Sequence, residues 1–385
     1  MRVAILGAGP AGLYLGYRLK RRRPEIEVRV IEQNPPDATF GFGVVFSDRA
    51  LEFLCEDDPD TYCAITPHLE SWTDITVSHR GEAIRMEGVG FSAIGRLHLL
   101  QILQERACSV GIAPLYRRAI TSLDELGEPD LIVGADGANS LVRNTLAAEF
   151  GTTISYLNNR FAWFGTTRRF DTLTQTFRAG PLGHFNAHHY RYSPAMSTFI
   201  VEIDPTTFAN VGFDRLDEGR SKAICEEVFA EELGGCALVT NRSIWRQFPN
   251  IWNERWWHRN CVLVGDALRT AHFSIGSGTR LALEDVIALD SALQRHHDDV
   301  ASALPAFEAA RRPIVEKLVT AANASAAWYE HFAEHMRLAP IDFVMSYMTR
   351  TGRVDRERLR AISPRFLAQY EAARSPTTTI AGMRA

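Results

Sequence analysis

The sequence predicts a mixed α/β fold with three parts: a domain built on a parallel sheet, an inserted β-sheet domain and a C-terminal helical region. Three observations lead to this prediction. Short apolar segments followed by glycine recur along the chain, at residues 3–6, 131–133 and 261–264. Between the last two, aromatic and β-branched residues fill 161–170 and 197–202, a composition typical of strands. Beyond about residue 303 the apolar residues have helical spacing.

The composition is that of an ordinary globular protein. The chain has 385 residues, 46% of them hydrophobic and 23% charged, with a formal net charge of −4. A nucleic-acid partner is therefore not indicated. At about 100–200 residues per domain, this length predicts two or three structural units. Composition gives no indication of the oligomeric state.

No targeting or metal-binding segment is recognised. The apolar N-terminal stretch is interrupted at Gly7, too early for a signal peptide, and no apolar run reaches the roughly 18 residues that a membrane span needs. The six cysteines lack C-x-x-C spacing, which disfavours a disulfide framework or a zinc site. These features predict a cytoplasmic protein with reduced thiols, no membrane contact and no metal.

The first element is a βαβ unit. Residues 3–6 form a short apolar strand, 11–23 have helical spacing, and 27–32 alternate as a second strand. Between the first strand and the helix stands Gly7-Ala8-Gly9-Pro10-Ala11-Gly12, a G-x-G-x-x-G motif. A dinucleotide-binding loop occupies this position between strand and helix.

Each glycine of this loop has a physical role. Gly7 permits the tight turn, Gly9 lets the backbone approach a pyrophosphate, and Gly12 lets helix and strand pack closely. The helix N-terminus at Pro10-Ala11 offers backbone N–H groups to the phosphates. Glu32 follows Gly12 by 20 residues, where its carboxylate can accept hydrogen bonds from an adenosine ribose. The loop therefore predicts a dinucleotide, either NAD or FAD.

Two later acidic turns favour FAD. Asp136 and Asp266 each follow an apolar segment, so both are expected at the carboxyl end of a strand, where open α/β sheets bind ligands. A carboxylate there can accept a hydrogen bond from a polyol hydroxyl. After Asp266, Gly276-Ser277-Gly278-Thr279 precedes the helical run 280–289. The positive end of such a helix suits the electron-rich edge of a reduced flavin.

The C-terminal region is predicted to consist of two helices, 303–322 and 326–337. Pro313 and Pro340 are expected to be kinks or boundaries, because proline lacks the N–H that a helix interior requires. The expected role of these helices is packing.

The elements divide the chain into three predicted domains. A discontinuous Rossmann-like FAD-binding domain comprises residues 1–75, 95–155 and 245–300. A substrate-binding β domain comprises 76–94 and 156–244. A C-terminal helical region comprises 301–385.

The ordered motifs carry a family resemblance. They are Gly7 to Gly12, Glu32, Gly134-Ala135-Asp136-Gly137 with Ser140 and Arg143, and Gly265-Asp266-Ala267 with Gly276-Ser277-Gly278. The set resembles the group A FAD-dependent aromatic monooxygenases of the para-hydroxybenzoate hydroxylase type. The resemblance implies that Glu32 holds the ADP part of FAD, Asp136 contacts FAD and NAD(P)H, and Asp266 binds the ribityl chain. It also implies an FAD contact for Arg96, for which a surface arginine at a helix start is the alternative.

Longer segments are similar to one branch of this family. They are residues 40–48, 95–96, 159–161, 188–190, 197–202 and 271–279. The branch contains salicylyl-CoA 5-hydroxylase, the monooxygenase half of anthraniloyl-CoA monooxygenase and the violacein-pathway hydroxylase. The resemblance runs from residue 1 to about 350 and implies that Val45 and 276–279 contact the cofactor. The segment 375–385 gives no functional indication.

The sequence departs from the wider family at positions expected beside the reactive edge of the flavin. Pro, His and Asn of the family are replaced there by Phe273, Arg269 and Arg280. In the 40s loop, the arginines of para-hydroxybenzoate hydroxylase are replaced by Phe42, Gly43 and Val45. A phenolate-binding arginine is therefore not carried over to this chain.

The resemblance also implies the chemistry. NAD(P)H reduces FAD, O₂ adds to give a C4a-hydroperoxide, and the distal oxygen is transferred to an aromatic ring, while the protein positions the ring and excludes water. His272 is the candidate for a polar group near C4a, with Phe273 beside it. His188 and Tyr190, two residues apart on a predicted strand, share a face and are candidates for lining the substrate pocket. A structural role remains the alternative for each of these side chains.

Three functions are consistent with the sequence. The leading one is a single-component aromatic hydroxylase that acts on an aryl-CoA thioester such as salicylyl-CoA, at ring position 5. Hydroxylation of an indole- or tryptophan-derived intermediate is the enzymatic alternative. A non-catalytic flavin-binding protein that protects an intermediate is the alternative of another class. Arg168, Arg169 and Arg178 are candidates for contact with a CoA phosphate, although arginines on a surface are ordinary.

Overall fold

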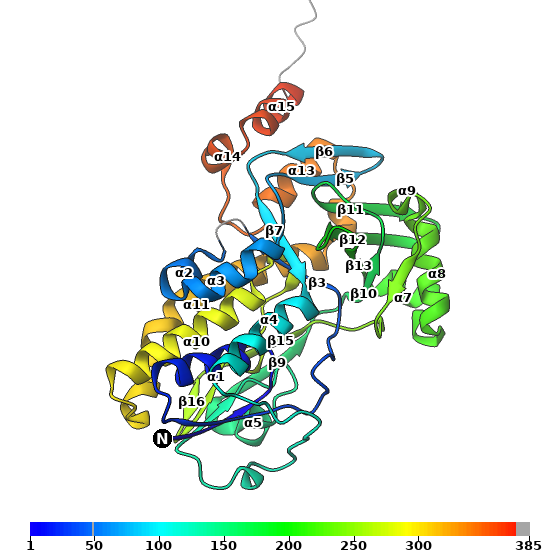
Figure 1. Ribbon diagram of the computed structural model, residues 1–385. Helices are drawn as coiled ribbons and strands as arrows, with labels where there is room; N and C mark the ends of the chain where they lie inside the picture. The colour runs from blue at the N-terminus through cyan, green and yellow to red at the C-terminus, as the bar shows by residue number, and fades with distance from the viewer. Residues whose placement is uncertain (48–49, 375–385) are drawn as a thin grey trace, which may run out of the picture.

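A five-stranded sheet organises one side of the molecule in the computed structural model, which describes residues 1–47 and 50–374 (Figure 1). Its order is β16-β17-β8-β1-β2. The strands are β1 (Arg2–Leu6), β2 (Glu27–Ile31), β8 (Leu131–Gly134), β16 (Trp257–His258) and β17 (Cys261–Leu263). All neighbours are parallel except β16 and β17. The predicted parallel sheet is confirmed, and its strands come from three distant parts of the chain.

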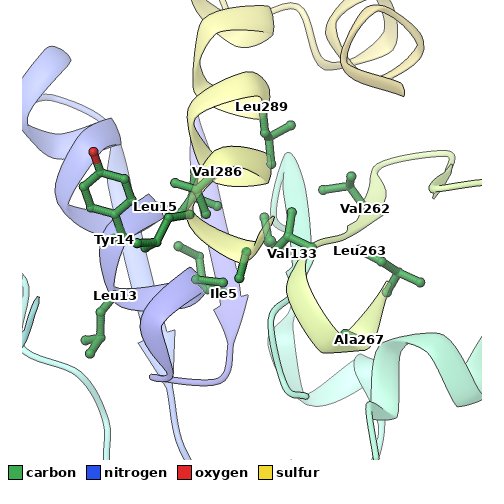
Figure 2. Packing of buried hydrophobic residues seen from close by; sticks show 14 of the residues in the cluster. Ile5, Leu13, Tyr14, Leu15, Val133, Val262, Leu263, Ala267, Val286 and Leu289 are labelled. Atoms are coloured by element: carbon green, nitrogen blue, oxygen red, sulfur yellow. The ribbon is translucent and has the colours of Figure 1, made fainter. Parts of the chain in front are cut away.

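Helices α1 (Pro10–Arg22) and α10 (Gly278–Arg295) pack against each other and against this sheet. Figure 2 shows Leu15 of α1 and Val286 of α10 directed toward Ile5 and Val133 of the strands. All four side chains are fully buried. Strands covered in this way are apolar along their length, which explains the short apolar segments in the sequence.

A second, seven-stranded sheet follows the order β14-β10-β13-β12-β11-β5-β6. Its strands are β5 (Ile75–His79), β6 (Glu82–Met86), β10 (Arg160–Thr166), β11 (Leu173–Gly180), β12 (Gly183–Arg191), β13 (Ser197–Ile203) and β14 (Leu238–Thr240). Neighbours are antiparallel except β5 and β11. The structure confirms a strand in each of the regions 161–170 and 197–202, although β10 ends at Thr166 and residues 167–170 are not part of it. The domain boundaries stay a prediction.

Smaller elements connect the two sheets. β3 (Gly43–Ser47), β7 (Phe91–Gly95) and β4 (Glu70–Trp72) form one small sheet, and β9 (Thr152–Tyr156) pairs with β15 (Pro249–Asn253). The remaining helices before residue 280 are α2 (Glu52–Asp57), α3 (Pro59–Ile65), α4 (Arg96–Ser109), α5 (Leu141–Thr145), α6 (Ala147–Phe150), α7 (Pro205–Val211), α8 (Glu218–Val228) and α9 (Ala230–Leu233). Asp48, part of the branch resemblance, and residues 375–385 lie outside the described part of the chain.

The C-terminal helices differ from the prediction in how they are divided. Helix α11 (Val300–Glu330) continues through residues 323–325, so the expected division into 303–322 and 326–337 is wrong, and it also continues through Pro313, which is therefore not a helix boundary. The buried side chains of Phe307, Val315 and Val319 continue along α11 on both sides of Pro313, and such packing outweighs the lost hydrogen bond. Pro340 is a boundary as expected, since it opens α13.

The last part of the chain that the structure describes consists of short helices at one end of the molecule. They are α12 (Phe332–His335), α13 (Pro340–Thr349), α14 (Arg356–Ile362) and α15 (Pro364–Arg374). Figure 1 shows α14 and α15 near β6 and β7. Among the helices of the described residues, none combines the length and the apolar content needed to cross a bilayer.

Candidate active site

A cavity of about 420 Å³ lies at the carboxyl ends of β1, β2 and β8. Gly7, Gly9 and Glu32 are among its lining residues. Glu32 Oε2 accepts a hydrogen bond from the Ala8 N–H at 2.9 Å, and its Oε1 accepts from the Asn34 N–H at 2.8 Å. The predicted acidic residue is thus tied to the glycine loop, and it lies where the ribose of a bound dinucleotide is expected.

The three loop glycines differ in what surrounds them. Gly7 has a φ of +98°, and an added Cβ would lie 2.3 Å from the carbonyl oxygen of Ala135. At Gly12 an added Cβ would lie 1.9 Å from the Gly7 oxygen, whereas at Gly9 it would meet nothing within 4 Å. Gly12 therefore serves close packing of helix and strand, while Gly9 faces the open cavity.

A second cavity, of about 490 Å³, adjoins the first and extends between the two large sheets. The two cavities share the lining residues Gly9, Pro10, Val44, Arg96, Ala135, Gly137 and Thr279. Together they form one elongated space. Every residue that the sequence assigned to the cofactor lines one of the two cavities, except Gly12.

Polar atoms in this space lack protein partners. Asp136 Oδ1 and Arg96 Nε are buried without a hydrogen bond, and the Asp266 carboxylate faces the cavity. Burial raises the pKa of both carboxyl groups and lowers that of Arg96. Buried polar groups are normally satisfied, so these atoms fit a ligand with hydroxyl and phosphate groups. The residues present are therefore suited to FAD.

The start of α10 faces the second cavity. Gly276 (φ +61°), Ser277, Gly278 and Thr279 line it. An added Cβ at Gly278 would meet nothing within 4 Å, so the backbone at the positive end of an 18-residue helix is open to a ligand. This geometry fits the expected contact with the electron-rich edge of a flavin.

Two positions expected beside the flavin lie elsewhere. Arg269 is buried and binds Asp285 at 2.7 Å, and Asp285 Oδ2 also accepts the Gly265 N–H at 3.2 Å. Arg280 pairs with Glu284 one turn along α10. Neither arginine lines the cavity, so that expectation was wrong for both, because their charges are neutralised within the helix layer. Phe273, the third such position, does line the cavity.

Strand β12 contributes side chains to the wall of the larger cavity. His188 and Tyr190 both line the cavity, as their spacing predicted. The Tyr190 hydroxyl donates to the Gly43 carbonyl at 3.2 Å, and burial raises its pKa to about 12. His189 points to the other face of the sheet, where its ring stacks on Phe199. His188 and His189 are thus neighbours on β12 that lie on opposite faces of the sheet, the first in the cavity wall and the second in the core.

His188 contacts a buried carboxyl group that the sequence had left without a role. His188 Nε2 lies 3.5 Å from Glu202 Oε2, and both side chains are at most 5% exposed. Glu202 Oε1 accepts from Asn159 Nδ2 at 2.9 Å, and the Asn159 N–H donates to Glu330 Oε1 at 2.9 Å. A chain of polar groups therefore leads from the cavity toward the half-buried Glu330.

His272 lies behind the cavity wall. Its side chain is 3% exposed and is not among those that line the cavity, although its ring packs against Phe273 at a centroid distance of 4.2 Å. His272 Nδ1 is bonded to Ser274 Oγ at 2.8 Å, and Ser274 Oγ to Ser325 Oγ at 2.8 Å. Arg350 Nε donates to Ser325 at 3.0 Å. His272 is thus held by a network that reaches the C-terminal helices.

Burial sets the charge state of this wall. It lowers the pKa of His188 to about 3 and that of His272 to about 4, and it raises the pKa of Glu202. The nearby Arg350 acts in the same direction on both histidines. Both imidazoles are therefore neutral at pH 7 and can each donate and accept a hydrogen bond.

Sequence reasoning missed four residues of this wall. Besides Glu202 they are Gln175, Tyr329 and Arg350; the Tyr329 hydroxyl donates to Gln175 Oε1 at 3.1 Å. A glutamate within the apolar run 197–203 was the available signal for Glu202, since a charged residue in a buried strand needs a reason. Tyr329 and Arg350 arrive from the C-terminal helices, and no local pattern marks them.

Comparison with known sequences agrees with this geometry. A family described as "FAD binding domain" matches residues 125–322. Salicyloyl-CoA 5-hydroxylase of a Streptomyces species is 42% identical over 361 residues, which cover 91% of this chain and 70% of that protein.

The names of two further relatives give other substrates. A 3-hydroxy-4-methyl-anthranilyl-[aryl-carrier protein] 5-monooxygenase of Streptosporangium sibiricum is 37% identical, covering 86% of this chain and 89% of the relative. Protodeoxyviolaceinate monooxygenase of Chromobacterium violaceum is 33% identical, covering 91% and 94%.

Solved structures support the fold. A crystal structure of 2-methyl-3-hydroxypyridine-5-carboxylic acid oxygenase matches with a TM-score of 0.70 at 17% identity, covering 94% of this chain and 96% of that one. At such low identity the match concerns the fold alone.

Proposed function

The chain belongs to the FAD binding domain family and is an FAD-dependent aromatic monooxygenase, and on this basis we propose that it hydroxylates an aryl-CoA thioester such as salicyloyl-CoA with NADH or NADPH and O₂. The proposal extends to this chain what the name of its 42% identical relative says of that protein.

One observation about charge supports a thioester over a free acid. Among the described residues that line the larger cavity, only Arg96 and Arg350 are cationic. Arg350 donates to Ser325, to the Tyr347 carbonyl at 2.7 Å and to the Ser274 carbonyl at 3.2 Å. Arg96 lies in the part of the cavity shared with the dinucleotide. The one cation away from the dinucleotide thus has its three guanidinium nitrogens bonded to neutral protein groups, which leaves fewer N–H groups for a free carboxylate, while the neutral carbonyl of a thioester requires no cation.

FAD, when bound, supplies the oxygen-transfer chemistry, and the protein residues position the aromatic ring. We assign His188 as the group that binds the ring hydroxyl of the substrate, since its imidazole is neutral, lies in the cavity wall and has Glu202 behind it. Phe161, Trp163 and Phe273 give the ring an apolar surround that excludes water. In salicyloyl-CoA, position 5 is para to this hydroxyl and is activated by it.

His272 is assigned a positioning role in this proposal. Its ring supports Phe273 from behind the wall, and its network through Ser274 and Ser325 fixes Arg350. Substitution of His272 by Ala should therefore lower hydroxylation less than substitution of His188, with FAD retained in both variants.

The test is mass analysis of products. The purified holoprotein is incubated with NADH or NADPH, O₂ and one of four compounds: salicyloyl-CoA, anthraniloyl-CoA, salicylate or an indole-derived acid. We expect one oxygen atom to be added to an aryl-CoA, together with substrate-stimulated NAD(P)H oxidation, and no product from salicylate. Hydroxylation of the indole compound alone would instead support the second candidate, suggested by the 33% identical violacein-pathway relative.

A flavin that NAD(P)H does not reduce in the presence of any aryl compound would contradict both enzymatic proposals. It would support a protein that binds flavin and protects an intermediate without turnover.

A further inference from the structure

The larger cavity has an end that lies away from the dinucleotide and leads toward the surface. The lining residues at this end are half-buried and mostly apolar: Val89, Phe91, Thr351, Val354 and Ile362. They come from the β6–β7 turn, from β7, from the α13–α14 loop and from α14. We call these five residues the mouth.

The mouth has a defined frame. Glu87, in the β6–β7 turn, accepts from the Arg365 N–H at 2.7 Å and from the Ser363 hydroxyl at 3.3 Å. Gly88 has a φ of +74°, and an added Cβ would lie 2.0 Å from the Ile362 carbonyl oxygen. The turn and the end of α14 are therefore in direct contact, so the mouth lies beside a packed junction between two elements.

The surface around the mouth is strongly basic. Residues 350–365 contain six arginines and two acidic residues, in a chain whose net charge is −4. Arg353 and Arg358 are exposed, and within the described part of the chain neither forms an ion pair. Arg353 donates to the Lys317 carbonyl on α11, which brings the exposed Lys317 to the same surface. Several cations are thus available to an anion just outside an apolar opening.

We propose that the CoA part of the substrate leaves the ring cavity through this mouth, with its pantetheine arm against the five mouth residues and its phosphates on the basic surface of Lys317, Arg353 and Arg358. The inference rests on the proposed aryl-CoA substrate. An aryl ring beside His188 must send its thioester arm out of the cavity, and the order from apolar wall to cationic surface matches the order from acyl group to phosphates along CoA.

The arginines of the inserted domain are less suited to this role. Arg178, one of the three that the sequence offered for a CoA phosphate, is paired with Glu231 and Glu232. None of Arg168, Arg169 and Arg178 lines the larger cavity.

The experiment compares two substrates in two charge-reversal variants of the holoenzyme. The substrates are salicyloyl-CoA and the N-acetylcysteamine thioester of salicylate, which keeps the thioester but lacks the phosphates. The double variant Arg353→Glu/Arg358→Glu is compared with the matched control Arg220→Glu, which reverses an exposed arginine at the start of α8.

We expect the double variant to raise KM for salicyloyl-CoA by about tenfold or more, with kcat unchanged and with no change for the N-acetylcysteamine ester. The control should match the wild type with both substrates. The KM of the wild type for salicyloyl-CoA should also rise with salt concentration, because exposed ion pairs are screened.

A second variant tests the path rather than the charge. Val354→Trp narrows the mouth and should reduce turnover of both thioesters while leaving the flavin content unchanged. If Val354→Trp processes both thioesters at the wild-type rate, the arm does not pass this way.

Other outcomes would overturn the inference separately from the proposed function. Equal KM values for salicyloyl-CoA in the wild type and the double variant would do so, as would a rise in KM caused by Arg168→Glu/Arg169→Glu instead. If the double variant raised KM only for a salicyloyl group carried on an aryl carrier protein, the basic surface would bind that protein and not the phosphates of CoA. Failure of every aryl thioester to be hydroxylated would remove the proposed function itself.

Discussion

His188 Nε2 lies 3.5 Å from Glu202 Oε2 on the neighbouring strand, and both side chains are buried beside the cavity. The pKa of the histidine is lowered and that of the glutamate is raised, both chiefly by burial. Burial therefore disfavours the charged form of each group, and with it an ion pair between them. The neutral imidazole of His188 can orient a substrate hydroxyl without placing a fixed charge of its own beside an apolar ring.

Replacement of His188 by Phe should lower the rate of hydroxylation by about tenfold or more, since the bond to the ring hydroxyl is lost. The cofactor should remain bound, and more NAD(P)H should be consumed per product formed, with the difference released as hydrogen peroxide. His189→Phe is the matched control, because that side chain points away from the cavity. Equal coupling in both variants would show that His188 is structural.

Replacement of Glu202 by Gln should act through His188. The amide keeps the shape of the side chain but cannot exchange a proton with the imidazole, so we expect a smaller loss of kcat than in His188→Phe and a displaced pH profile. The measurement is kcat against pH with the proposed aryl-CoA. A uniform loss at every pH, with an unmoved profile, would indicate a packing role only.

The buried His189 should make the stability of the folded protein depend on pH. Burial, assisted by His188 and Arg168, lowers its pKa in the folded protein to about 3 from 6.5. As the pH falls below 6.5, the unfolded chain binds a proton that the folded chain does not, so stability is lost from pH 6.5 down to about 3. His189→Phe removes this contribution. Between pH 6.5 and 5 the variant should lose about 2 kcal/mol less unfolding free energy than the wild type, measured by urea denaturation.

Alanine at two glycines of the first loop should have different effects. Gly12→Ala places a methyl group 1.9 Å from the Gly7 oxygen and should destabilise the apoprotein by about 3 kcal/mol or more. Gly9→Ala meets no protein atom within 4 Å, so apoprotein stability should change by about 1 kcal/mol or less. FAD affinity should nevertheless fall by about tenfold or more in Gly9→Ala. Full FAD affinity there would show that the pyrophosphate does not approach this backbone.

Asp266→Ala should yield a protein that is purified without flavin, because the carboxylate that faces the cavity is expected to hold the ribityl hydroxyls. Flavin absorbance per mole of protein is the measurement. Asp214→Ala, at an exposed site in the inserted domain, is the control. A yellow Asp266 variant with full flavin content would contradict the assignment.

The cofactor cradle could be predicted from the sequence because its information is local. Gly7, Gly9 and Gly12 stand within six residues of one another, and the turns at Asp136 and Asp266 follow apolar strands directly. Each of these segments is sufficient to specify a strand end and the loop that follows it.

The substrate wall could be predicted only in part. His188 and Tyr190 follow from the alternation of one strand. Arg350, which lines the cavity, and Tyr329, whose ring stacks on His188, are instead placed by the packing of α11 and α13, which no short pattern encodes. The continuity of α11 across residues 323–325 was missed for the same reason, since tertiary packing of buried side chains such as Ser325 and Ala326 holds this stretch in the helix. The position of Arg269 was predicted wrongly because its partner Asp285 lies on α10, and the sequence does not show where α10 packs.

The strand order of the first sheet determines when it can form during synthesis. Its centre is β8, and its neighbour β17 (Cys261–Leu263) belongs to the last part of the chain that contributes a strand. All seven strands of the other sheet precede residue 257. On the ribosome, the sheet that faces the substrate can therefore close before the sheet that binds the nucleotide is complete. Asp266 and the start of α10, which line the cofactor cavity, are thus synthesised after every strand of the seven-stranded sheet.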